Sequence, residues 1–251
     1  MNNRYSQVDI GNGVMLNLIP DSKYKTVEIR FYIHQELNKN STKAALLPLV
    51  MKRGCEGFET QKDLEIYLDE LYGSAFEVGI TKKGERHIIQ FSMSTAGKEY
   101  ISDGTILAKS LQLLHRILYK PLIEDSGFRR GYVEQEKENL SKIIRSLLND
   151  KAEYAAERCF QEMCKNERFS RYVYGNEEDL ESIDPMNLLE YYKEVLNTAP
   201  IDIFIIGDFE EEEAERLVKN IFNLEREKLY LIPGEIVKKA TGETKEIIEE
   251  M

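Results

Sequence analysis

The hydrophobic pattern of the chain is organised around one stretch that is apolar on every side. The apolar run covers residues 44–51, and a Lys-Arg-Gly sequence follows at residues 52–54. A helix that is apolar all round belongs in a protein core rather than on its surface. The basic pair and the glycine are typical of a helix C-terminus, with Gly54 in the left-handed cap position. We therefore predict a buried helix here, with Ser41 or Thr42 as its N-cap.

Alternating and helical spacings predict the remaining elements. Residues 26–33 alternate between apolar and polar side chains, as in a strand with one buried face. Strands are also predicted at residues 14–19, 75–82, 86–94 and 201–206, and helices at about residues 62–72, 105–119, 129–148, 152–166, 185–196 and 208–222. Lys83-Gly84 is a hairpin signal between two strands, and Asp208 can cap the last helix. These elements favour an α+β fold, in which helices cover one side of a largely antiparallel sheet.

Composition and charge limit the function. The chain has 251 residues, of which 42% are hydrophobic, so it has ample material for a core. Its formal net charge is −11, so phosphates would be repelled and nucleic acid is not expected as a partner. A basic peptide or protein partner is compatible with this sign, although an ordinary acidic surface is the simpler interpretation.

The cysteines and the hydropathy indicate a cytoplasmic protein. Cys55, Cys159 and Cys164 form no CxxC pair and are interpreted as free thiols in a reducing cytosol. No window approaches a membrane span, and the first residues lack the apolar centre of a signal peptide.

The hydrophobic pattern weakens after Glu227. Residues 1–227 are therefore predicted to form one α+β domain. Residues 228–251 contain a Pro-Gly break and a charged end, and we expect them to be a linker or the start of a second half of the protein.

The three histidines, His34, His87 and His115, give little support to a metal site or a catalytic base. No two of them lie one helical turn apart, so no His-x-x-x-His pair is present to bind zinc. A lone histidine with no mapped partner is interpreted as structural. The motifs for nucleotide binding and for serine or cysteine hydrolysis are also absent from the sequence.

One pair of carboxylates has the spacing that acid–base chemistry can use. Glu134 and Glu138 lie four residues apart on the helix predicted for residues 129–148. Lys137 and Lys142 lie within reach of them, and Glu138 followed by Lys142 is the favourable order on an exposed helix. A hydrated, charged helix face is the preferred interpretation.

The apolar helix and its surroundings resemble the insulinase/pitrilysin family of zinc peptidases. Members of that family carry H-x-x-E-H on a buried helix that ends in a basic or aromatic residue and glycine. With Gly54 matched to that glycine, the two histidine positions fall on Ala45 and Leu49, and the glutamate position falls on Pro48. The family's third ligand is a glutamate on a later long helix, and its position here falls on Ile143. The resemblance therefore implies the family scaffold without its metal-binding residues, and no cofactor is expected.

Further motifs extend the resemblance over about residues 14–225. They are Glu134-Gln135-Glu136-Lys137 at the start of the long helix, Leu71-Tyr72-Gly73-Ser74, Tyr119-Lys120-Pro121-Leu122, Tyr174-Gly175 through Ile183, and Ile203 to Phe209. Together they resemble the non-catalytic, YmfF-type branch of the family. The resemblance implies the fold shared by LuxS and the mitochondrial processing peptidase. It also implies that this chain is the N-terminal half of a subunit with two similar halves.

The first functional hypothesis is a catalytically inactive, peptidase-like subunit. The resemblance implies a partner, which is an active zinc-peptidase homologue or a second copy, and a chamber for extended peptides. A strand near Ala75, Phe76, Glu77 and Val78 at the sheet edge could bind such a peptide through its main chain. A simpler version of this hypothesis has the domain support an active partner without touching any peptide.

The alternative hypothesis is an active metallopeptidase with unusual ligands. In that case Glu134, Glu136, Glu138, His34 and His87 would have to converge on a zinc ion, and nothing in their spacing indicates that they do. Zinc is expected as a cofactor only under this alternative.

Overall fold

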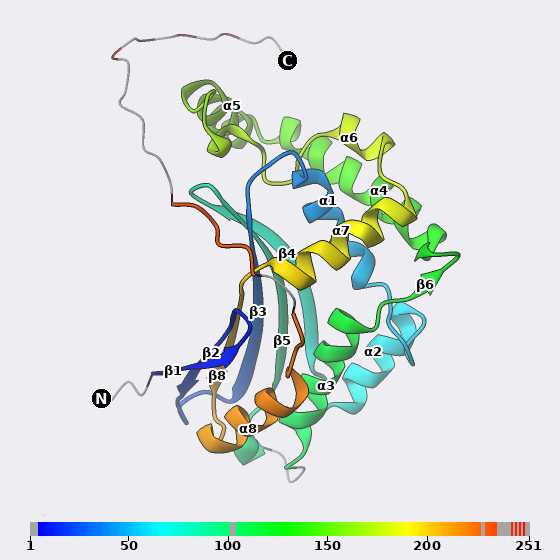
Figure 1. The fold of residues 1–251 in the computed structure, drawn as a ribbon, viewed down its shortest axis with the longest axis vertical. Helices are drawn as coiled ribbons and strands as arrows, with labels where there is room; N and C mark the ends of the chain where they lie inside the picture. The colour runs from blue at the N-terminus through cyan, green and yellow to red at the C-terminus, as the bar shows by residue number, and fades with distance from the viewer. Residues whose placement is uncertain are drawn as a thin grey trace.

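A six-stranded sheet with helices on one of its faces forms the framework of the protein (Figure 1). The structure is a computed structural model that describes residues 5–100, 104–226 and 229–234 and the single residues 242, 244, 246 and 248. The strands follow the order β1-β2-β8-β3-β5-β4. The pair of β2 and β8 is parallel, and the other pairs in this sheet are antiparallel. The predicted α+β fold with a largely antiparallel sheet is confirmed.

The strands of this sheet are β1 (Ser6–Gly11), β2 (Val14–Pro20), β3 (Thr26–Glu36), β4 (Ala75–Lys83), β5 (Arg86–Ala96) and β8 (Ile201–Gly207). The helices are α1 (Ser41–Met51), α2 (Gln61–Glu70), α3 (Ile106–Tyr119), α4 (Arg130–Ser146), α5 (Lys151–Met163), α6 (Glu177–Glu181), α7 (Pro185–Thr198) and α8 (Glu211–Ile221). A small hairpin joins β6 (Ile123–Glu124) to β7 (Gly127–Phe128), and the short turns η1 (Lys98–Tyr100), η2 (Leu147–Asn149) and η3 (Arg168–Ser170) complete the described elements.

The central strand β3 shows how the two faces of the sheet differ. Phe31 of β3 is paired with Phe91 of β5 on one side and with Ile203 of β8 on the other. Paired residues share a face, so these three side chains lie together on the side of the helices, where each is at most 1% exposed. On the opposite face Tyr32 and His34 remain partly exposed. The alternation predicted for residues 26–33 is confirmed.

Helix α1 is present as predicted, but its two ends are built differently. Its N-cap residue is Asn40, and no side chain caps the helix. The Ser41 hydroxyl donates to a loop carbonyl, and the Thr42 hydroxyl bonds to the segment around α6. Gly54 does not have a left-handed φ. A glycine is needed there because a Cβ would lie 2.7 Å from the backbone oxygen of Phe58. The predicted N-cap and the predicted left-handed C-cap are therefore wrong.

Helix α8 begins later than predicted, and Asp208 does not cap it. Asp208 is 5% exposed directly after β8, whereas the helix begins at Glu211 behind the N-cap residue Glu210. Glutamates in the first turn stabilise that end of the helix through its dipole. The sequence also gave no signal for β1, whose six residues include only two large apolar side chains. Main-chain pairing with β2 makes it a strand.

The segment that follows α8 is held against the domain. Phe222 packs on Phe31 in the core, with ring centroids 4.8 Å apart. The guanidinium of Arg226 donates to the carbonyl oxygens of Leu196, Asn12 and Ala199. Farther along, the backbone N–H of Tyr230 donates to the carbonyl oxygen of Thr198 at 2.8 Å. Most of the predicted linker at residues 228–251 lies outside the described residues, and a domain boundary at residue 227 stays a prediction.

Candidate functional site

The positions matched to the zinc motif lie on α1 and α4, two helices that pack against each other. All residues of α1 except Lys43 and Leu49 are buried, and the helix packs on the sheet and against α4, α6 and α7. Ala45 is 2% exposed and Pro48 is buried. On α4, Ile143 is half-buried and packs against the same hydrophobic core. The four positions matched to the zinc motif therefore carry hydrocarbon side chains that contribute to packing.

The residues at this place do not fit a zinc ion. Methyl, isobutyl, sec-butyl and pyrrolidine groups have no lone pairs, so none of the four side chains can be a metal ligand, and none is a carboxylate that could activate a water. A small cavity lies at the end of α1, between Met51, Phe128 and Tyr132, and has a volume of about 10 Å³. None of the four matched positions lines it. The chemistry of the four side chains is therefore what argues against zinc.

An ion pair joins the two helices instead. Arg53 follows α1 and pairs with Glu136 of α4, whose side chain is only 6% exposed. The guanidinium also donates to the side-chain oxygen of Gln61 at 3.2 Å, and Asn139 donates to the second carboxylate oxygen of Glu136 at 3.2 Å. Hydrogen bonds of this kind compensate for the desolvation of a buried charge. Sequence reasoning missed this pair, because it assigned Arg53 to the helix dipole.

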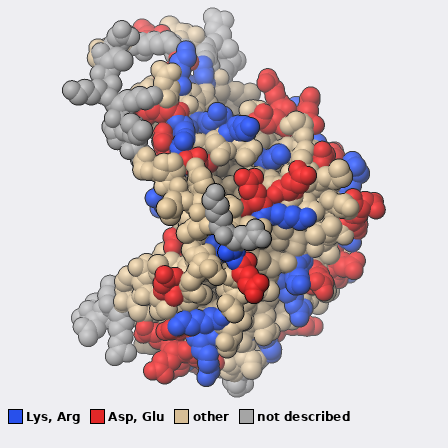
Figure 2. All heavy atoms as spheres, in the orientation of Figure 1, with Lys and Arg blue, Asp and Glu red and all other residues tan. Residues whose placement is uncertain are grey.

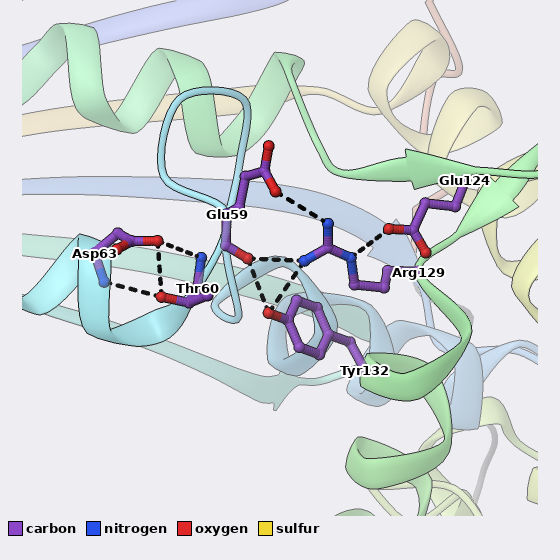
Figure 3. Close-up of polar contacts among 6 residues, drawn as sticks. All are labelled: Glu59, Thr60, Asp63, Glu124, Arg129 and Tyr132. Atoms are coloured by element: carbon purple, nitrogen blue, oxygen red, sulfur yellow. Dashed lines mark hydrogen bonds and ion pairs between the residues drawn. The ribbon is translucent and has the colours of Figure 1, made fainter.

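A second polar cluster fixes the start of α4 (Figure 3). Arg129 donates from Nε to Glu124 of the β6–β7 hairpin at 2.6 Å and from Nη1 to the backbone oxygen of Glu59 at 3.0 Å. The Tyr132 hydroxyl donates to the same backbone oxygen at 2.8 Å. Glu124 is the main reason that the pKa of Arg129 is raised. Directly after Glu59, Thr60 and Asp63 form a capping box for α2. The cluster connects the β6–β7 hairpin, the loop before α2 and the start of α4. Its polar groups are hydrogen-bonded to one another, which indicates a structural role.

The two histidines of the alternative hypothesis lie on opposite faces of the sheet. In the register of β3 and β5, His34 is paired with Ile88 and Gln35 is paired with His87. Neighbouring residues of a strand point to opposite sides, so the two imidazoles cannot converge. His34 contacts Asp202 at 2.8 Å on the open face. His87 is 1% exposed and donates from Nε2 to the carbonyl oxygen of Val173 at 2.8 Å, and burial lowers the pKa of His87 to about 4.

The glutamates of the alternative hypothesis are also engaged elsewhere. Glu136 is paired with Arg53, and the carboxylate of Glu134 lies 3.6 Å from Lys137 on its own helix. Within the described part of the chain, no group of three or more His, Cys, Asp or Glu side chains is arranged to hold a metal ion. Glu138 is exposed on the same helix. These three glutamates and the two histidines therefore form no common site.

Strand β4, the predicted peptide-binding strand, lies at one edge of the sheet as expected. It pairs with β5 on one side, and no other described strand pairs with its outer side. Ala75 and Glu77 are exposed, whereas Phe76 is 7% exposed and Val78 is half-buried against the core. Among the described strands, none occupies the outer main-chain edge of β4. Binding of a peptide to these four residues stays a prediction.

Comparisons with known proteins show which proteins this chain is related to. A scan against models of protein families finds no match. The "Probable inactive metalloprotease YmfF" of Bacillus subtilis (strain 168) is 34% identical to this chain over 240 residues, which are 95% of this chain and 56% of that protein. The chain is therefore a homologue of a protein described as a probable inactive metalloprotease. The predicted resemblance to the non-catalytic, YmfF-type branch of the insulinase/pitrilysin peptidases is confirmed by that relationship.

Solved structures show the same relationship. The crystal structure of a conserved protein from Enterococcus faecalis V583 is 32% identical, with a TM-score of 0.83 over 89% of this chain and 53% of that one. A peptidase M16 inactive domain from Pseudomonas fluorescens shares the fold at 14% identity, with a TM-score of 0.70 over 88% of this chain and 50% of that one. The chain thus spans about half the length of the relatives that it matches.

Among the described helices, none combines the length and the apolar character needed to cross a membrane.

Proposed function

We propose that this chain is a catalytically inactive, peptidase-like domain that pairs with a second domain of its family and holds an extended peptide along β4. The observation that carries the proposal is the intact family fold with alkyl side chains at Ala45, Pro48, Leu49 and Ile143. A domain of this kind can contribute a binding surface, but it cannot hold a metal-bound water.

The edge of β4 supports the peptide part of the proposal. Strand addition to a sheet edge uses the free N–H and C=O groups of the main chain and needs no particular side chain. The inward side chains of Phe76 and Val78 anchor β4 to the core. The side chains of Ala75 and Glu77 point to the opposite face of the sheet and are exposed. A peptide paired with β4 would become the seventh strand, next to β4 and farthest from β1.

Charge indicates which peptides to test first. The net charge of the chain is −11, and an acidic domain attracts basic ligands. Figure 2 shows acidic side chains spread over the visible face rather than gathered beside one element. We therefore expect a general preference for basic peptides, set by the field of the whole domain, and no fixed position for a single basic residue.

Hydrogen exchange tests the peptide site directly. The purified chain is incubated with an unstructured, lysine-containing decapeptide or with an acidic decapeptide of the same length, and amide exchange is followed by mass spectrometry or NMR. We expect the basic peptide to slow the exchange of alternate amides in β4, because those amides face away from β5 and would become hydrogen-bonded.

Strand β1 is the internal control, since it forms the other edge of the same sheet. Its amides should exchange at the same rate with and without peptide. Unchanged exchange in β4 at saturating peptide concentration would contradict the peptide site. Equal protection of both edges would show unspecific strand pairing and would contradict it as well.

Metal titration tests the assigned zinc-motif positions. Isothermal titration of the chain with zinc chloride should show no site of micromolar or tighter affinity. The combined substitutions Ala45→His, Pro48→Glu, Leu49→His and Ile143→Glu should create such a site. A variant that stays folded by circular dichroism and still fails to bind zinc would contradict the assignment of these positions.

The partner and the cellular location are further parts of the proposal. We propose an active zinc-peptidase homologue as the second domain or subunit, with self-association as the alternative, and a cytoplasmic location. Purification of the native protein from its own cells, followed by mass spectrometry, should recover a protein that carries H-x-x-E-H. Recovery of this chain alone, without such a homologue, would favour self-association.

A further inference from the structure

Helix α5 turns its apolar side toward solvent. Five exposed apolar residues of α5, together with one from the preceding turn η2, form a set that we call the α5 face: Leu148, Ala152, Ala155, Ala156, Cys159 and Met163. At 3.6 residues per turn, the members within α5 fall in an arc of roughly 100°. Met163 is 68% exposed and Leu148 is 52% exposed, and no residue of α5 is buried. The helix therefore buries none of its apolar stripe in the domain.

The charged side of α5 attaches it to the domain instead. Glu157 accepts a hydrogen bond from Lys82 of β4 at 3.2 Å, and the two side chains are 11% and 13% exposed. The ammonium of Lys82 also donates to the carbonyl oxygens of Phe169 and Arg171 at 3.3 and 3.0 Å. Phe160, at the margin of the stripe, packs edge-on against Phe169 of η3. These contacts fix the orientation of α5, with the α5 face pointing outward.

This orientation is the reverse of that of an ordinary surface helix. An amphipathic helix normally packs its apolar stripe on the core and leaves its charges in water, as α8 does with Ala214 and Val218. An apolar patch that is rimmed by charged residues marks an interaction site in folded proteins. The α5 face is rimmed by Lys151, Glu153 and Glu162. It therefore has the character of a docking surface.

The size of the α5 face indicates what covers it. A patch of six such side chains exposes on the order of a few hundred Å². A symmetric contact between two copies through this patch alone would bury less than the roughly 1,200 Å² of a stable interface. Two copies would also each carry a net charge of −11, which opposes their association. The α5 face is thus suited to a partner that other contacts or a covalent connection already hold nearby.

The relatives supply such a partner. They are about twice as long as the part that this chain matches, so a second domain of similar size accompanies it in them. In this chain, the segment after α8 approaches the end of the sheet where η3 and α5 lie (Figure 1). The Tyr230 hydroxyl is hydrogen-bonded to Glu36, and Glu36 accepts a hydrogen bond from Arg168 of η3 at 2.8 Å.

We propose that the α5 face docks against the second peptidase-like domain, namely the one that makes up the remaining half of the relatives' length. This inference rests on the proposed pairing and names its contact surface. The apolar side chains of the α5 face enter the interface, and the Lys82–Glu157 contact sets the angle at which α5 is presented. Because Lys82 belongs to β4, the docked domain would lie next to the strand proposed to bind peptide.

A native cysteine reports on the occupancy of this surface. Cys159 is exposed within the α5 face, whereas Cys55 is fully buried and burial raises the pKa of its thiol to about 11. In a Cys164→Ser variant, a maleimide reagent should label Cys159 of the purified 251-residue chain rapidly and leave Cys55 unmodified. In the native assembly isolated from its own cells, we expect labelling of Cys159 to be slowed at least tenfold.

A photoreactive maleimide attached to Cys159 identifies the occupant. The variant is labelled, reassembled with the second domain and irradiated, and the crosslinked peptides are sequenced by mass spectrometry. Crosslinks to the second peptidase-like domain support the inference. Crosslinks between two copies of this chain, or protection of Cys159 only by phosphatidylglycerol vesicles, would overturn it.

A charge placed within the α5 face tests its role in pairing. Ala156→Lys should weaken pairing with the second domain at least tenfold, because the interface would bury an unpaired ammonium group. Lysine is a good helix former and position 156 is exposed, so helicity should be unchanged. Glu153→Gln changes the net charge by the same amount on the same helix, outside the α5 face, and should leave pairing within twofold of the original chain.

The two proposals fail in different ways. If the native protein pairs with a second domain while Cys159 stays reactive and Ala156→Lys pairs normally, then the contact surface is wrong and the pairing stands. If no second domain is found in any preparation, then the proposed pairing itself is wrong.

Discussion

Helices α1 and α5 are similar in length but bury their side chains in opposite ways. In α1, all residues except Lys43 and Leu49 are buried against the sheet and three other helices. In α5, no residue is buried, and its described contacts to the domain come from Glu157 on the charged side and from Phe160 at the margin of the apolar stripe. The comparison shows that α1, the helix matched to the zinc motif, is part of the hydrophobic core, whereas the apolar face of α5 is exposed. The four positions matched to the zinc motif carry hydrocarbon side chains that pack on the core, whereas the α5 face is exposed.

Truncation of a core side chain in α1 should have the largest effect on stability. Leu46 is 0% exposed, so Leu46→Ala removes buried apolar surface and leaves a cavity. We expect the free energy of unfolding to fall by about 2–5 kcal/mol, measured by urea denaturation. A loss below about 1 kcal/mol would show that α1 is not part of the rigid core, and the contrast with α5 would no longer hold.

Acidification should lower the free energy of unfolding through His87, whose hydrogen-bond partner Val173 lies in the segment that follows α5. His87 donates to Val173, which follows α5 and precedes the contact of Asn176 with Thr42 of α1. Burial holds the pKa of His87 near 4 in the folded protein, below its usual value of 6.5, so the unfolded chain takes up the proton first. The free energy of unfolding should therefore fall as the pH drops from about 6.5 and stop falling near pH 4, by up to about 3 kcal/mol in total.

His87→Gln isolates this contribution. The glutamine amide can donate to the same carbonyl oxygen and does not titrate in this range. The difference in unfolding free energy between the variant and the original chain, measured from pH 4 to pH 7, should change with pH. A difference that is constant over this range would contradict the assigned pKa of His87.

Removal of one charge from the α1–α4 ion pair should have a somewhat smaller effect. Glu136→Gln leaves Arg53 without its counter-ion, and the Arg53 side chain is 20% exposed and so keeps some contact with water. We expect a loss of about 2–3 kcal/mol in urea denaturation. Glu134→Gln is the matched control on the same helix, because Glu134 is 51% exposed, and it should change stability by less than about 0.5 kcal/mol. Equal effects of the two variants would show that the ion pair does not link the helices.

Substitution in the α5 face should have the smallest effect on stability. Met163 is 68% exposed, so Met163→Ser should change the free energy of unfolding of the isolated chain by less than about 0.5 kcal/mol. A destabilisation comparable to that of Leu46→Ala would mean that the α5 face is covered within the chain itself. The contrast between the two helices would then be lost.

The sequence by itself determined the elements whose signal is local. The unbroken apolar run predicted a buried α1, and the alternation in β3 predicted a strand with one covered face. Absence of ligands at Ala45, Leu49 and Ile143 was also visible in the sequence, because it depends only on residue identity. These features needed no knowledge of which segments meet in space.

Only the tertiary structure decided which groups meet. Arg53 pairs with Glu136, which lies 83 residues later in the sequence. Glu157 of α5 pairs with Lys82, which lies 75 residues earlier. An amphipathic pattern defines two faces of a helix, but the segments packed against it decide which face turns inward. The physical reason is that burial and hydrogen bonds between segments distant in the sequence set the orientation of each helix. The local spacing of residues carries no information about which distant segments will meet.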